Sequence, residues 1–77
     1  MKPMVTIYSS DTCPYCIATK EYLKSNKIEF IEKNITNSDI ARSELMKMGY
    51  MSVPLIIIDD EIIEGFDQEK LASILNI

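Results

Sequence analysis

The strongest constraint on the fold is a short strand pattern that leads into a helix pattern through Cys13-Pro14-Tyr15-Cys16. Apolar and polar residues alternate along residues 4–8, which is typical of a strand. Residues 9–12 offer Ser, Asp and Thr side chains that cap helices, and Pro14 suits the first helical turn. A helix is therefore predicted to residues 26–27. One face of it is predicted to contain Tyr15, Ala18, Thr19, Tyr22 and Leu23.

A second strand and a second helix are predicted next. Residues 28–32 read as a strand with Ile28 and Phe30 on one face. The polar loop at residues 34–38 caps a helix that stops at Gly49. The apolar stripe of this helix is predicted to contain Ala41, Leu45 and Met48.

The last third of the chain predicts a hairpin and a final helix. Apolar residues 55–58 and 62–63 flank an acidic turn, and Gly65 ends the second hairpin strand. Asp67 is the predicted N-cap of the last helix. The resulting order β-α-β-α-β-β-α predicts an α/β fold, in which a four-stranded mixed sheet is flanked by three helices. Seventy-seven residues are expected to form a single domain, 1–77.

Charge and hydropathy narrow the classes of function. A net charge of −4 disfavours nucleic acid, which basic groups bind by displacing counterions. No apolar run approaches the roughly 20 residues of a membrane span. Residues 1–6 lack the apolar stretch and cleavage site of a secretory signal. We therefore expect a cytoplasmic protein that acts as a monomer, away from membranes and nucleic acid.

Two cysteines in a reducing compartment are more often catalytic or metal-binding than structural. Two cysteines without a histidine cannot complete a four-ligand zinc site in one chain, so no metal is expected. The lack of histidine also disfavours a cysteine protease, which uses imidazole to form its thiolate.

Thiols at positions i and i+3 of a helix start lie close enough to form a disulfide ring. Unpaired N–H groups and the helix dipole favour a thiolate at Cys13, whereas Cys16 lies one turn further, toward the buried face. Cys13 is therefore the predicted nucleophile and Cys16 the resolving thiol in thiol–disulfide exchange. The alternatives are a pair of core cysteines, or half of a metal site shared with a second chain.

Thr12-Cys13-Pro14-Tyr15-Cys16 resembles the active site of dithiol glutaredoxins, and the resemblance spans residues 4–75. It implies a thioredoxin fold and an oxidoreductase that reduces protein or glutathione mixed disulfides. Glutathione would be a co-substrate, and no bound cofactor is implied. Thr12, Pro14 and Tyr15 would support the two cysteines, and Tyr15 would also contact substrate.

Two further segments carry the resemblance. Ser52-Val53-Pro54 is similar to the Thr-Val-Pro of that family, whose proline follows a cis bond and faces the active cysteine. By that likeness Pro54 supports the site, and Ser52 and Val53 bind substrate. Glu64-Gly65-Phe66-Asp67 is similar to the family's Gly-Gly-x-Asp segment. It implies that Gly65, Phe66 and Asp67 hold the γ-glutamyl carboxylate of glutathione at a helix N-terminus.

The chain also departs from that pattern. Ser10 and Tyr50 stand where the family often has basic residues that contact the glycine carboxylate of glutathione. Glu64 replaces the first glycine of the pair, and Lys47 could compensate. Gly65-Phe66 also resembles the Ser-Gly-Phe of glutaredoxin-like redoxins that take electrons from thioredoxin reductase and serve ribonucleotide reductase.

Three functions therefore stay open. The first is a glutathione-coupled glutaredoxin that acts on disulfide-containing client proteins. The second is a redoxin charged by thioredoxin reductase. The third is an iron–sulfur cluster carrier, although such carriers typically show Cys-Gly-Phe-Ser, and Pro14, Tyr15 and Cys16 depart from that motif.

Overall fold

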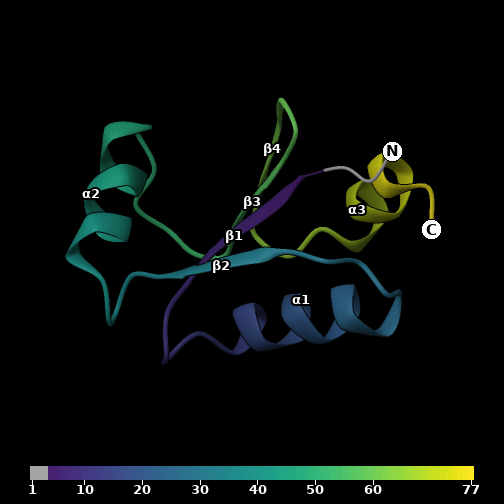
Figure 1. Cartoon of the computed structure of the whole chain (residues 1–77), viewed down its shortest axis with the longest axis horizontal. Coiled ribbons are helices and arrows are strands. Elements are labelled where there is room, and N and C mark those ends of the chain that lie inside the picture. The colour runs from purple at the N-terminus through teal and green to yellow at the C-terminus, as the bar shows by residue number, and fades with distance from the viewer. Residues whose placement is uncertain (1–3) are drawn as a thin grey trace.

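The computed structural model describes residues 4–77 and has the predicted order of elements (Figure 1). Residues 1–3, which belong to the predicted domain and to the segment expected to lack an export signal, lie outside the described part. No helix within residues 4–77 is long and apolar enough to cross a membrane. The elements are β1 (Val5–Ser9), α1 (Pro14–Ser25), β2 (Ile31–Asn34), α2 (Asp39–Lys47), β3 (Leu55–Ile58), β4 (Glu61–Glu64) and α3 (Gln68–Leu75).

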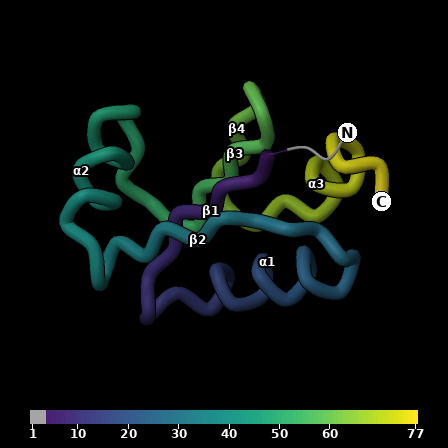
Figure 2. The backbone as a smooth tube through the Cα atoms, in the orientation of Figure 1, coloured from purple at the N-terminus to yellow at the C-terminus, as the bar shows by residue number. Residues whose placement is uncertain are grey.

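The four strands form one mixed sheet in the order β2-β1-β3-β4. The chain leaves β1, runs along α1 and returns to β2, which pairs with β1 in parallel (Figure 2). The β3–β4 hairpin is antiparallel, and β3 also pairs antiparallel with β1. The central strand β1 therefore points its carboxyl end, Ser9, at the loop that carries the cysteines.

Alternation along the strands supplies two apolar faces. Val5 and Ile7 of β1 lie in the larger core, which also contains Leu23 of α1 and Leu71 of α3. Tyr8 of β1 points to the opposite face. There it packs with α2 through Ala41 and Leu45, and with Leu55. Helices α1 and α3 thus cover one face of the sheet, and α2 covers the other (Figure 1).

The second strand starts three residues later than predicted, at Ile31 instead of residue 28. The turn that ends α1 extends into this segment. In this turn the N–H of Ile28 donates to the Leu23 carbonyl at 2.9 Å, and Lys27 has a positive φ of 58°. Ile28 and Phe30 still pack against the larger core, as predicted, although they precede the pairing with β1.

Two residues of the predicted apolar stripes are not buried. Met48 does not continue the buried stripe of α2 but is 36% exposed, because the helix ends at Lys47 and Gly49 turns the chain with φ +88°. Tyr15 does not belong to the buried face of α1 but is 66% exposed. The buried face of that helix contains Cys16, Thr19 and Leu23.

Candidate active site

The N-cap of α1 is Cys13 itself, and not one of the Ser, Asp or Thr residues before it. Its Sγ accepts a hydrogen bond from the backbone N–H of Cys16 at 3.1 Å. Its own N–H donates to the carbonyl of Ser10 at 3.4 Å, which closes the turn between β1 and α1. The Cys13 sulfur thus pairs with one of the N–H groups that a helix start leaves without an intrahelical partner.

The loop before β3 lies against the sulfur of Cys13. The Cys13 thiol lies 3.6 Å from the carbonyl oxygen of Val53, to which it can donate. The Val53–Pro54 peptide bond is cis, as predicted, and Pro54 is buried. Segments 40 residues apart in sequence therefore meet at the reactive sulfur.

The two cysteines are free thiols in different surroundings. Cys13 is 9% exposed and Cys16 is fully buried at 0%, so the predicted order of accessibility is right, although neither side chain is widely open. Burial, and then the hydrogen bond to Cys13, raises the pKa of Cys16 to about 12. Cys13 is therefore the more accessible of the two thiols, and the raised pKa of Cys16 favours its protonated form.

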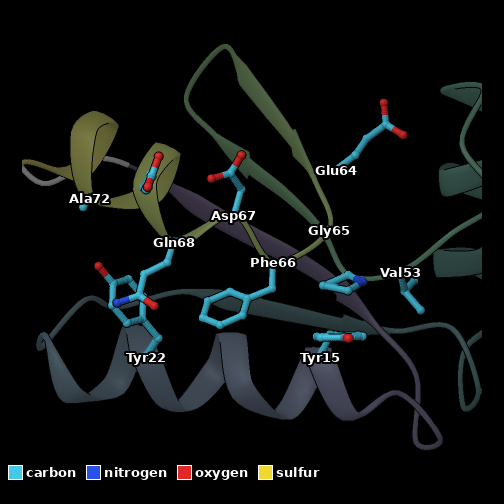
Figure 3. A pocket seen from close by; sticks show the side chains of 11 residues that line it. Tyr15, Tyr22, Val53, Glu64, Gly65, Phe66, Asp67, Gln68 and Ala72 are labelled. Atoms are coloured by element: carbon cyan, nitrogen blue, oxygen red, sulfur yellow. The ribbon is translucent and has the colours of Figure 1, made fainter.

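An open groove with a volume of about 880 Å³ lies next to the cysteine motif. Figure 3 shows the Phe66 ring between Tyr22 and Tyr15 of α1. The rings of Tyr22 and Phe66 meet edge to face, with centroids 5.9 Å apart. The groove is lined by Tyr15, Tyr22, Val53, Pro54, Glu64, Gly65, Phe66, Asp67, Gln68, Glu69 and Ala72.

Most of the predicted substrate-binding residues line this groove. They are Tyr15, Val53, Gly65, Phe66 and Asp67, together with Pro54. Ser52 is exposed and does not line it. Thr12 is an exposed turn residue directly before Cys13.

Four lining residues were not predicted from sequence: Tyr22, Gln68, Glu69 and Ala72. The signal for Tyr22 was its seven-residue spacing from Tyr15, which places both rings on one face of α1. Gln68 and Glu69 open α3 directly after Asp67, whose carboxylate caps the helix by accepting from the Lys70 N–H at 3.1 Å.

Gly65 joins the hairpin to this helix start. It has φ +76°, a conformation that favours glycine, and its N–H donates to the Pro54 carbonyl at 2.8 Å. That bond fixes the segment of Phe66 and Asp67 beside the Val53–Pro54 loop. The three segments that were predicted to bind substrate are thereby brought together.

The charge of the groove is negative. Glu64, Asp67 and Glu69 line it, and no lysine or arginine is found among its described lining residues. In Figure 3 the carboxylates of Glu64 and Asp67 project on the side away from α1. Neither Ser10, Tyr50 nor Lys47 lines the groove.

The sheet, the cysteine at the α1 N-cap and the cis-proline loop define a thioredoxin-fold redox protein. The glutaredoxin family model matches residues 5–63. An uncharacterized glutaredoxin-like 8.6 kDa protein in the rubredoxin operon of Clostridium pasteurianum is 41% identical over 94% of this chain and 97% of that protein. The chain belongs to the glutaredoxin family.

Relatives of two kinds are similar to this chain. The glutaredoxin-like protein NrdH of Lactococcus lactis is 34% identical over 92% of this chain and 99% of its own length. Glutaredoxin 3 of Escherichia coli is 41% identical over 82% of this chain and 77% of its own length. The chain is therefore a glutaredoxin-like redoxin with similarity to both.

Solved structures agree with this fold. The thioredoxin-like protein BC3987 superposes with a TM-score of 0.86 at 33% identity and covers 92% of this chain and 99% of that one. The NrdH-redoxin of Escherichia coli, whose structure concerns a thioredoxin-like activity profile, has a TM-score of 0.83 at 26% identity. It covers 91% of this chain and 92% of that one.

Proposed function

We propose that this protein is a thiol–disulfide oxidoreductase that reduces disulfides of client proteins through Cys13 and Cys16. The observation that carries the proposal is the unequal pair: Cys13 caps α1 with an N–H bonded to its sulfur, and Cys16 is buried with a pKa of about 12. Cys13 attacks the client disulfide and forms a mixed disulfide. Cys16 then attacks Cys13, releases the client thiol and leaves an intramolecular disulfide.

Glutathione is the proposed co-substrate, which would reduce the intramolecular disulfide of Cys13 and Cys16. Val53 next to the cis-proline offers backbone groups to an extended thiol, as an added strand would. The N–H groups at the start of α3 suit the γ-glutamyl carboxylate, and Asp67 suits the ammonium. These groups line one groove, and Val53 lies next to both this groove and Cys13. The sulfur of a bound glutathione would therefore lie at Cys13.

The charge of the groove favours a second electron donor. Three carboxylates and no cation among the described lining residues disfavour the anionic tripeptide glutathione. A redoxin reduced by thioredoxin reductase needs no glutathione site, and it would supply electrons to ribonucleotide reductase. The similarity to proteins named NrdH also supports this candidate.

Two coupled assays on one protein disulfide test the proposal. One supplies glutathione, glutathione reductase and NADPH, and the other supplies thioredoxin reductase and NADPH. Turnover in either assay supports the oxidoreductase, and turnover in neither assay by fully reduced, folded protein would contradict it. Faster turnover with thioredoxin reductase identifies the second candidate as the electron route.

We expect glutathione to react at Cys13 with an elevated KM, because Ser10 and Tyr50 offer no cation to its glycine carboxylate. Each missing charge-assisted contact weakens binding by about 1.5–3 kcal/mol when well formed, and by less when exposed. The Ser10→Lys variant should therefore have a lower KM for glutathione, with a larger gain at low salt.

Ser43→Lys is the matched control, because it adds the same charge at an exposed position of α2. Equal effects of the two lysines would show that net charge alone acts. An unchanged KM in Ser10→Lys would contradict the argument from the missing cation.

A further inference from the structure

An ion pair joins α1 to the sheet one helical turn after Cys16. Lys20 Nζ lies 2.7 Å from Glu32 Oε2 on β2. The same oxygen accepts a second hydrogen bond, at 2.7 Å, from the hydroxyl of Ser9 on β1. Ser9 is fully buried, whereas the Lys20 and Glu32 side chains are 25% and 33% exposed. The buried Ser9 hydroxyl thus holds the Glu32 carboxylate, which in turn holds the Lys20 ammonium group in a fixed place.

This network fixes the charge of Glu32. The hydrogen bond from Lys20, and then that from Ser9, lowers the pKa of the Glu32 carboxyl. The carboxylate therefore stays ionised at neutral pH and keeps its hold on Lys20. Lys24, one further turn along α1, also acts on Glu32 through its charge.

The position of Lys20 relates it to the buried thiol. Residues four apart on a helix are neighbours on its surface, so Lys20 and Cys16 share a side of α1. Burial and the Cys13 thiol raise the pKa of Cys16. A backbone hydrogen bond at Ser10 lowers it, and the positive charge of Lys20 lowers it further by a smaller effect.

We propose that Lys20, held by Glu32 and Ser9, is a positioning residue that stabilises negative charge on Cys16 while this thiol resolves the mixed disulfide. The proposal rests on the function proposed above. In this step the Cys16 thiol loses its proton to water, and its sulfur bonds to that of Cys13. The bond between Cys13 and the client sulfur breaks, and the client thiolate leaves and takes up a proton.

The chain has no histidine that could take the proton of the buried thiol or bring a positive charge to it. A partly screened charge about one helical turn away changes the thiolate fraction about tenfold. A more basic thiolate is also about threefold more nucleophilic, so the two effects partly cancel. Loss of the Lys20 charge is therefore expected to slow the resolving step about threefold.

The uncharged disulfide 4,4′-dithiodipyridine separates the two steps in a stopped-flow experiment. Attack by Cys13 releases one thiopyridone, and attack by Cys16 releases the second. We expect Lys20→Met to slow the second release about threefold and to leave the first unchanged. Lys20→Arg should restore the rate, and Lys47→Met is the control, because it makes the same charge change at an exposed position of α2.

The salt dependence of the second release is a further readout of the Lys20 charge. High salt should slow the second release in the wild-type protein and have no such effect in Lys20→Met. A normal second release in Lys20→Met, or equal slowing in Lys47→Met, would overturn the proposal. If Lys20→Met does not fold, Lys20→Gln and the salt dependence of the wild type carry the test. Absence of the first release would instead contradict the proposed function of Cys13.

Discussion

Replacing Cys13 by serine is expected to reduce disulfide reductase activity to the uncatalysed background, because a hydroxyl cannot form the mixed disulfide. Cys13 is the thiol that borders the Val53 loop and accepts the Cys16 N–H. The Cys16→Ser variant should behave differently. It should still attack a client disulfide and then accumulate as the mixed disulfide, visible on a non-reducing gel and by intact mass.

The two serine variants control for each other, since each removes one sulfur from the same turn. Residual reductase activity in Cys13→Ser, together with a trapped client, would reverse the assignment. Thermal unfolding of both variants checks that a lost activity reflects chemistry and not a lost fold.

The largest expected effect on stability is at Leu23. This side chain is fully buried between α1 and the sheet and lies in the larger core. Leu23→Ala removes buried apolar contacts and leaves a cavity, which costs about 2–5 kcal/mol. In a domain of this size each kcal/mol lowers Tm by about 4–8 °C, so Tm should fall by at least about 8 °C.

Ile17→Ala is the matched control for Leu23→Ala, because Ile17 lies on the same helix and is 52% exposed. Its effect on the free energy of unfolding should stay within about 0.5 kcal/mol. Similar Tm values for the two variants, measured by circular dichroism, would contradict the assigned core.

The order of elements could be predicted because local signals agree with the tertiary fold, whereas the substrate-binding segments at residues 52–54 and 64–67 were predicted from the resemblance to glutaredoxins. Asp67 is a predicted cap and is observed to accept from the Lys70 N–H. Gly49 and Gly65 are predicted stops and have positive φ. Backbone preferences of this kind depend on a few neighbouring residues, so the sequence carries them directly.

Features that depend on contacts distant in sequence could not be predicted as well. The start of β2 depends on the turn that ends α1, where the Leu23 carbonyl accepts a hydrogen bond and Lys27 has a positive φ. The alternation of apolar and polar residues does not reveal this turn. Tyr15 fits a helical stripe, but it lies exposed in the first turn of α1 and borders the groove. The Ser9–Glu32–Lys20 network joins three elements, and no local pattern indicates it.

The central claim is that Cys13 and not Cys16 reacts with disulfides, and brief alkylation tests it most directly. Reduced protein is treated with iodoacetamide at neutral pH, quenched with acid and mapped by mass spectrometry. A thiol with a pKa of about 12, as for Cys16, has a thiolate fraction on the order of 10⁻⁵ at pH 7. Early label on Cys13 with Cys16 unmodified is the predicted result. Equal labelling, or label first on Cys16, would contradict the account.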